Sequence, residues 1–247
     1  MRLIVTRPEP DASRTAEALS RLGHEPILSP MLDIVLDAKA AIPDREFQAV
    51  LATSSNAVRA LADHSDRGRL QDRLLFAVGD HTALQAKRAG FGAARSAGGA
   101  IGDLVARVAA ELSPAAGPLL YAAGDAQAGD LAGQLGKLGF EVDVAVVYRA
   151  KARMRLAPRA AAALRRDQAE GILLYSRRSA EAFAQALRLE GLAPLTTGVA
   201  CFCLSAAVAE PIPAVARGRI IIAERPDQLS LFASVEREAA LNAGDGS

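Results

Sequence analysis

The sequence predicts an α/β protein with two similar domains, each a parallel sheet flanked by helices. Three observations lead to this class. Short apolar runs alternate with helical stretches along the 247 residues, which is typical of parallel strands joined by helices. The runs are nearly all apolar, as burial on both faces of a sheet requires. Segments of the first half resemble segments of the second, which favours two sheets over one large sheet.

The predicted strands are short aliphatic runs that end in glycine or in small polar residues. In chain order they are residues 3–6, 26–29, 48–53, 74–78, 119–122, 142–148, 171–175, 199–204 and 219–223. Runs of this length fit strands and are too short for buried helices.

The segments between these strands have helical periodicity. The predicted helices are residues 11–22, 56–63, a helix that follows Gly79 and ends near Ala89, then 102–112, 129–138, 156–166, one helix after each of the strands 171–175 and 199–204, and 228–240. Gly23 and Gly139 follow two of these helices, where a residue with positive φ commonly ends a helix.

The internal similarity involves two pairs of segments. Residues 19–25 resemble residues 135–141, and residues 51–57 resemble residues 173–179. The two offsets are similar, at roughly half the chain, which predicts two cognate units. Chance similarity among α/β segments is the alternative, because all such segments follow one pattern.

Composition excludes several classes of protein. Hydrophobic residues make up 51% of the chain and tryptophan is absent, so we expect aliphatic cores. A net charge of +1 argues against nucleic acid or a membrane as the main partner. The N-terminus does not read as a signal peptide, and no apolar run could span a bilayer. Cys201 and Cys203 alternate along one strand, which predicts buried thiols and a cytoplasmic location.

The sequence carries no familiar cofactor motif. The phosphate-binding P-loop, the complete dinucleotide-binding glycine motif and the zinc-protease helix motif are all missing. The three histidines are scattered without the spacing of metal ligands. We therefore expect neither a metal nor an organic cofactor.

The positive signal lies at the junctions between strands and helices. Nearly all of them carry hydroxyl, amide or glycine residues: Thr6-Arg7-Pro8, Thr53-Ser54-Ser55-Asn56, Gly79-Asp80-His81-Thr82, Gly124-Asp125-Ala126-Gln127, Ser176-Arg177-Arg178-Ser179 and Leu204-Ser205. Helix N-termini at such junctions attract carboxylate or phosphate, and open α/β sheets bind ligands at this edge. Helix capping uses the same residue types and explains any single junction equally well.

Three arginines of these junctions and one tyrosine add charged or proton-donating groups to this signal. Arg7, Arg177 and Arg178 could bind carboxylates through paired hydrogen bonds. Tyr148 lies between the two similar segments, at the expected joint of the domains, and its phenol could donate a proton there. A packing role for Tyr148 is the alternative.

The residues of these junctions, and their order along the chain, resemble those of the uroporphyrinogen-III synthase family. The resemblance covers essentially the whole chain and rests on IVTRP (4–8), LGHE (22–25), PMLDI (30–34), TSSNAV (53–58), VGDHTA (78–83), YAAGD (121–125), VVYR (146–149) and AERP (223–226). Each motif is short, so their ordered spacing carries the resemblance.

The resemblance implies two flavodoxin-like, doubly wound domains joined by a two-stranded linker. One domain is discontinuous, residues 1–34 with 152–247, and the other is inserted, residues 37–147. The linkers lie around residues 35–36 and 148–151, and Tyr148 is placed at the mouth of an interdomain cleft. A monomer is expected.

It also implies the reaction. Hydroxymethylbilane, a linear tetrapyrrole polycarboxylate, loses water, its last ring is inverted through a spiro intermediate, and the macrocycle of haem, corrin and chlorophyll biosynthesis closes. No cofactor is needed. Tyr148 is the expected catalytic residue. The expected substrate-binding residues are Arg7, Thr53, Ser54, Ser55, Asn56, Thr82, Gly124, Asp125, Ser176, Arg177, Arg178, Ser179 and Ser205. Transient hand-over from the preceding pathway enzyme is a further expectation.

The chain departs from the family pattern at two places. Residues 203–208 replace the family's second Gly-x-x-Thr-Ala motif, so the threonine hydroxyl is missing there and Ser205 is the candidate substitute. Arg177 and Arg178 replace part of the family's Thr-Ser-Pro-Ser motif. The family's contacts therefore carry over less completely to the discontinuous domain than to the inserted one. Two alternatives stay open: a non-catalytic two-domain binder of an anionic metabolite, and a flavodoxin-like cofactor protein, which would be coloured.

Overall fold

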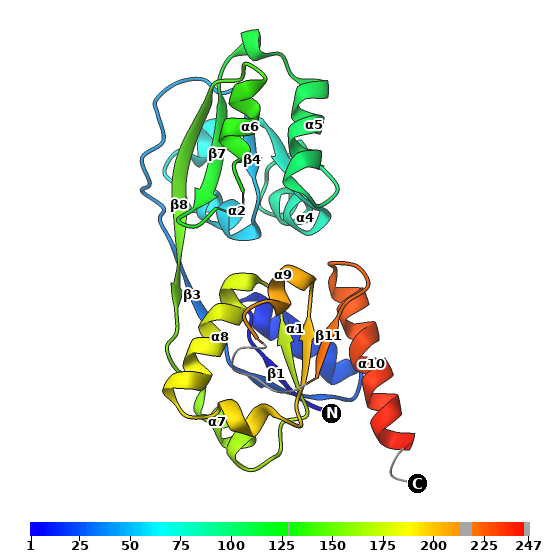
Figure 1. Ribbon diagram of the computed structural model, residues 1–247. Coiled ribbons are helices and arrows are strands. Elements are labelled where there is room, and N and C mark those ends of the chain that lie inside the picture. The colour runs from blue at the N-terminus through cyan, green and yellow to red at the C-terminus, as the bar shows by residue number, and fades with distance from the viewer. Residues whose placement is uncertain (128, 213–218, 245–247) are drawn as a thin grey trace. The chain divides into compact units, whose positions relative to one another are not determined.

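The chain forms two compact units. The computed structural model describes residues 1–127, 129–212 and 219–244 (Figure 1). Unit 1 comprises Met1–Asp33 and Lys151–Ser247, and unit 2 comprises Ile34–Ala150. None of the helices in the described ranges combines the length and the apolarity needed to cross a bilayer.

Unit 1 is a parallel sheet with helices. Its strands lie in the order β11-β10-β9-β1-β2, and each neighbouring pair is parallel. The elements are β1 (Arg2–Val5), α1 (Asp11–Arg21), β2 (Glu25–Leu28), α7 (Pro158–Arg165), β9 (Gly171–Leu174), α8 (Arg177–Leu189), η2 (Ala193–Thr196), β10 (Ala200–Cys203), α9 (Ala206–Ala209), β11 (Ile220–Ile222) and α10 (Gln228–Gly244).

Unit 2 repeats this plan with an extra edge strand. Its sheet has the order β3-β8-β7-β4-β5-β6. The elements are β3 (Leu32–Leu36), β4 (Ala49–Ala52), α2 (Ser55–Ala62), α3 (Arg67–Leu70), β5 (Leu74–Ala77), α4 (Asp80–Arg88), β6 (Ala94–Ser96), α5 (Ile101–Glu111), η1 (Pro114–Ala116), β7 (Leu119–Gly124), α6 (Leu131–Lys137) and β8 (Val142–Ala152).

The internal similarity in the sequence corresponds to a repeated sheet. The similar segments pair β9 with β4, and the turn before β2 with the turn before β8. With these matches, the order β11-β10-β9-β1-β2 of unit 1 becomes β6-β5-β4-β7-β8, which is the order found in unit 2. The two segments resemble each other because they occupy equivalent places in two sheets of one topology.

Both sheets are covered on their two faces. In unit 2, one face packs against the apolar sides of α2 and α4, with Val58 and Ala86 in that core. The opposite face packs against α5 and α6, with Leu104 and Leu135. In unit 1, α1 and α10 cover one face, and Phe202 lies in that core. This two-sided burial is the reason the central strands contain almost no polar residue.

The predicted alternation of strands and helices is confirmed, and three details differ. β6 and the short helix α3 were not predicted, because each is only three or four residues long and lacks a clear apolar period, and β3 was expected only as part of the linker. The strand predicted to end at Tyr148 continues to Ala152. The sheet of unit 2 is not wholly parallel, because β3 runs antiparallel to β8.

β3 and β8 are also the two chain segments shared between the units. The amide of Asp37 donates to the carbonyl of Val147 at 2.8 Å, and that of Arg153 donates to Met31 at 2.9 Å. The expected linker residues 35–36 and 148–151 therefore lie in paired strands. Arg153 Nε also donates to Asp33 Oδ1 at 2.9 Å, and this contact lowers the pKa of Asp33.

Candidate functional site

In unit 2, the predicted site residues gather at one edge of the sheet. β8, β7, β4 and β5 are successive neighbours and run parallel, so their carboxyl ends lie at the same edge. Each of these strands contributes to that edge, which we call the unit 2 edge: Tyr148 from β8, Gly124 and Asp125 from the end of β7, Thr53–Asn56 after β4, and Gly79–Thr82 after β5. This is the position at which open α/β sheets bind ligands.

Tyr148 is half-buried and packs against the core under α2 and α4. The pairing of β7 with β8 shifts by one residue here, so that Ala123 pairs with Val146 and Gly124 with Tyr148. The extra residue, Val147, is a β-bulge. As a result, Val147 and Tyr148 both contact the same core although they are consecutive.

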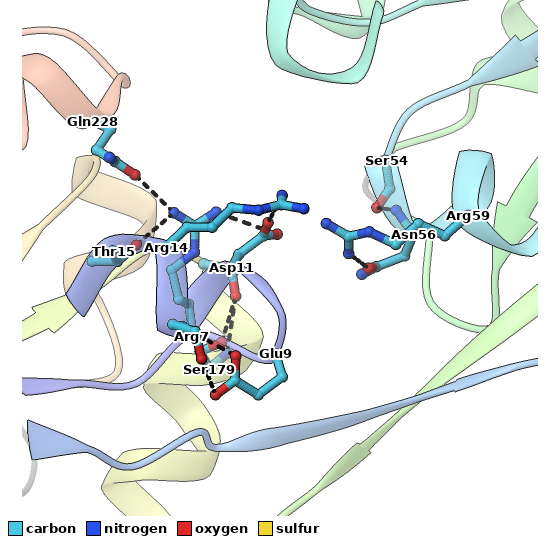
Figure 2. Close-up of polar contacts among 12 residues, drawn as sticks. Arg7, Glu9, Asp11, Arg14, Thr15, Ser54, Asn56, Arg59, Ser179 and Gln228 are labelled. Carbon is cyan, nitrogen blue, oxygen red and sulfur yellow. Dashed lines mark hydrogen bonds and ion pairs between the residues drawn. The ribbon is translucent and has the colours of Figure 1, made fainter. Parts of the chain in front are cut away.

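The loop after β4 is held by its own hydroxyl and amide groups. Ser54 precedes α2, and its Oγ accepts a hydrogen bond from the amide of Asn56 at 3.1 Å. Asn56 Oδ1 in turn accepts from Arg59 Nη1 at 2.6 Å (Figure 2). Thr53 Oγ1 lies 3.1 Å from the phenol oxygen of Tyr121, a buried residue of β7. Thr53, Ser54, Ser55 and Asn56 remain partly accessible.

The start of α4 differs from that of α2. Gly79 precedes the helix and has no side chain to cap it, and Asp80 places a carboxylate in its first turn. Thr82, which we expected to bind substrate, is 6% exposed. At this junction Asp80 and His81 are exposed, whereas the Thr82 side chain has little surface left for a ligand.

In unit 1, the predicted residues lie at the corresponding edge. β1, β9 and β10 are neighbours, and their carboxyl ends lead to Arg7, Ser176–Ser179 and Ser205. We call this the unit 1 edge. Ser176 caps α8: its Oγ accepts from the amide of Ser179 at 3.1 Å and donates to Ser179 Oγ at 2.9 Å. Ser205 precedes α9 and makes no side-chain cap, and α9 is only four residues long.

Arg177 at this edge already contacts two carboxylates. Arg177 Nε donates to Glu181 at 3.0 Å, and Arg177 is also paired with Glu210. Arg178, the next residue of α8, is half-buried. Exposed pairs such as those of Arg177 contribute little stability, so a ligand carboxylate could exchange with either glutamate at small cost.

Arg7 is the most elaborately held side chain of the unit 1 edge. Its Nη1 donates to Thr15 Oγ1 at 3.2 Å and to Gln228 Oε1 at 3.0 Å, and its Nη2 lies 3.5 Å from Asp11 (Figure 2). Its guanidinium also stacks on the ring of Tyr175, 4.3 Å from the centroid. Burial raises the pKa of Tyr175, and the charge of Arg7 opposes this shift.

Sequence reasoning missed the partners of these residues. Tyr121 and Tyr175 were interpreted as packing residues. The phenol of Tyr121 instead bonds to the Thr53 hydroxyl, and the ring of Tyr175 stacks on the Arg7 guanidinium. Gln228 was expected only as the start of a helix. For Tyr121, the available signal was a tyrosine near the end of a buried strand, since its phenol needs a partner, which is Thr53. Within the described ranges, no cluster of three or more His, Cys, Asp or Glu side chains is arranged to hold a metal.

Comparison with known proteins found a matching family and similar structures. The family model described as uroporphyrinogen-III synthase HemD matches residues 13–233. A crystal structure of uroporphyrinogen-III synthetase from Helicobacter pylori is similar, with a TM-score of 0.62 and 18% identity over 98% of this chain and 100% of that chain. The crystal structure of a mutant uroporphyrinogen III synthase from the extremely thermophilic bacterium Thermus thermophilus has a TM-score of 0.55 and 17% identity, over 96% of this chain and 98% of that chain.

These structural similarities, at such low identity, establish the two-sheet fold alone. The comparison with curated proteins found no significant match. The family model, in contrast, spans most of the chain. The chain therefore belongs to the uroporphyrinogen-III synthase family, a family of hydro-lyases in porphyrin and tetrapyrrole biosynthesis.

Proposed function

We propose that this chain converts hydroxymethylbilane into uroporphyrinogen III in the cytoplasm, with Tyr148 as its catalytic residue. The family match over residues 13–233 supports the reaction. The position of Tyr148, at the carboxyl edge of the sheet beside the loop after β4, supports its role. The substrate is received from the enzyme that precedes it in the pathway.

The reaction needs a proton donor at one position. The hydroxyl of the terminal hydroxymethyl group leaves as water, and protonation or hydrogen bonding by the Tyr148 phenol assists this departure. A carbon–oxygen bond breaks, and the electron-deficient carbon is then attacked by the substituted carbon of the last pyrrole ring. The spiro intermediate rearranges, the ring closes in inverted orientation and a proton is lost, so the net change is loss of one water molecule.

The acetate and propionate arms of the substrate need several weak anion sites. At the unit 2 edge, we propose that Thr53, Ser55 and Asn56 donate hydrogen bonds to these carboxylates, together with the backbone at the start of α4. At the unit 1 edge, the corresponding groups are those of Arg7, Arg177, Arg178 and Ser205. Ser179, which we expected to bind substrate, is only 1% exposed and its hydroxyl already accepts from Ser176, so its part is in the cap of α8. Ser54 and Ser176 act mainly by capping the helices that present these groups.

Holding both ends of a flexible chain together accounts for much of the acceleration, because the closing step becomes intramolecular. Catalysis of this kind depends on the geometry of the binding groups more than on any single acid or base. We therefore expect single substitutions at the carboxylate-binding residues to reduce the type III fraction before they abolish turnover.

The isomer assay tests the proposal directly. Purified protein is incubated with hydroxymethylbilane, the products are oxidised, and the type I and type III isomers are separated by chromatography. We expect rapid formation of type III, and a loss of roughly 100-fold in rate for Tyr148→Phe. Substrate without protein, which closes slowly to type I, is the control.

Two outcomes would count against the proposal. If the protein binds the substrate but yields only type I at the uncatalysed rate, the chain is a binder of an anionic metabolite and not this enzyme. If type III forms at the full rate with Tyr148→Phe, the reaction stands and the role of Tyr148 is wrong.

A further inference from the structure

The ring of Tyr148 lies directly on the backbone of Gly124. A Cβ atom added at Gly124 would lie 2.5 Å from Cζ, 2.7 Å from the hydroxyl oxygen and 2.8 Å from Cε2 of Tyr148. These distances are far below van der Waals contact. The atoms involved are those of the hydroxyl-bearing end of the ring, so any larger residue at position 124 would displace the phenol group itself.

Asp125 binds the backbone of β8 at Tyr148 and again at Ala150, two residues further along the strand. The amide of Asp125 donates to the carbonyl of Tyr148 at 3.1 Å. Its carboxylate Oδ1 accepts from the amide of Ala150 at 3.3 Å. Asp125 therefore links the end of β7 to β8 at the point where the bulge has disturbed the regular ladder.

The bulge explains why such support is needed. A one-residue shift between β7 and β8 changes which side chain faces the core, and on the β7 side the local backbone is no longer fixed by regular pairing. Tyr148 contacts the core under α2 and α4 from one side. The Gly124 backbone limits the ring from the β7 side, and Asp125 holds the strand that carries it.

We infer that Gly124 and Asp125 are positioning residues that hold the Tyr148 phenol in place: Gly124 by lacking a side chain, and Asp125 by bonding to β8. This inference rests on the proposed role of Tyr148 in catalysis. It changes the expectation for Gly124 and Asp125, which act through Tyr148 and need no contact with the substrate.

A spectroscopic measurement tests the placement without any substrate. The chain has three tyrosines, so protein labelled with ¹³C at tyrosine Cζ gives three signals, which Tyr→Phe variants assign. Gly124→Ala should shift the Tyr148 signal and leave the other two in place. Gly136→Ala is the matched control, because a Cβ at Gly136 meets no atom within 4 Å. An unchanged Tyr148 signal in Gly124→Ala overturns the inference.

Kinetics then connect placement to turnover. We expect Gly124→Ala to lower kcat for type III formation by roughly 100-fold, since a misplacement of about 1 Å has effects of this size. In a Tyr148→Ala background, the same substitution should change the rate by less than about 2-fold, because the displaced ring is missing. Equal losses in both backgrounds would overturn the inference while the proposed function stands. An inactive wild-type protein would instead contradict the proposed function.

Folding of the variants offers a second criterion. If Gly124→Ala alone fails to fold, the double variant with Tyr148→Ala should fold, since the clash is removed. A double variant that is equally unfolded would overturn the steric part of the inference.

A separate comparison tests Asp125. Asp125→Asn retains an acceptor for the amide of Ala150 and should keep most of the activity, whereas Asp125→Ala should lower kcat more than it raises KM. Equal activity of the two variants would overturn the role of Asp125.

Discussion

The phenol oxygen of Tyr121 lies 3.1 Å from the hydroxyl oxygen of Thr53. Tyr121 belongs to β7 and is 1% exposed, whereas Thr53 follows β4 at the unit 2 edge and is partly accessible. One partner is therefore sealed in the core and the other can reach water. This difference makes the consequences of removing either hydroxyl unequal.

Thr53→Val should destabilise the protein more than Tyr121→Phe. The first change leaves a buried phenol without its partner and should cost about 2 kcal/mol, while the second should cost about 1 kcal/mol because the Thr53 hydroxyl can bind water. The double variant should be more stable than Thr53→Val alone, since no buried hydroxyl remains. Chemical denaturation of the three variants measures these differences. Strictly additive effects would show that the two hydroxyls are not coupled.

Capping by Ser54 can be separated from substrate binding. Ser54→Ala should cost about 1 kcal/mol of stability and Ser54→Gly only a few tenths, because glycine is tolerated before a helix. If Ser54 acts only as a cap, Ser54→Gly should keep the KM for hydroxymethylbilane. Ser20→Ala is the control, because Ser20 is exposed within α1, where alanine is favoured. A raised KM in Ser54→Gly with unchanged stability would show that the hydroxyl also binds substrate.

Arg7 and Arg14 both contact Asp11, and the two contacts should differ in strength. The Arg7 side chain is 19% exposed and that of Arg14 is 49% exposed. Arg7→Met removes a largely buried charge from a mostly buried carboxylate and should cost about 3 kcal/mol. Arg14→Met should cost less than about 1 kcal/mol. Thermal unfolding of both variants compares them, and equal losses would contradict the importance of burial at Arg7.

The two cysteines should be inert in the native protein. Both are free and fully buried, and burial raises the pKa of each thiol to about 12. At pH 8 only about one molecule in 10,000 then carries the reactive thiolate, and access is blocked as well. A thiol-specific reagent should label Cys201 and Cys203 only after unfolding in denaturant. Rapid labelling of native protein would contradict this expectation.

The same shift has a consequence for stability at high pH. Because the thiol pKa in the folded state lies above its ordinary value of 9.0, unfolded chains release these protons first as the pH rises. The thiols therefore favour the folded state fully below pH 9, and this contribution is lost progressively as the pH approaches 12. Replacement of both cysteines by alanine should flatten the pH dependence of unfolding in that range.

The strands and helices were largely predictable because local patterns determine them. A strand buried on both faces must be apolar along its length, as in β4, β7 and β9, and the small polar residues after each strand begin a helix. The alternation of strands and helices also predicted that the junction residues share one edge of each sheet, because neighbouring parallel strands end at the same edge. β3 was harder to recognise as a strand. It lies at the edge of its sheet with β8 as its one neighbour, so fewer contacts constrain its residue pattern.

The sequence by itself determined the two-sheet α/β class, the repeated unit and the residues at the two strand edges, because apolar periodicity and short junctions act over a few residues. Only the tertiary structure decided which groups touch: the bulge that turns Tyr148, its contact with Gly124, and the pairing of Thr53 with Tyr121. These contacts join residues 24 to 68 positions apart, and the register between strands, which no local pattern fixes to one residue, brings them together.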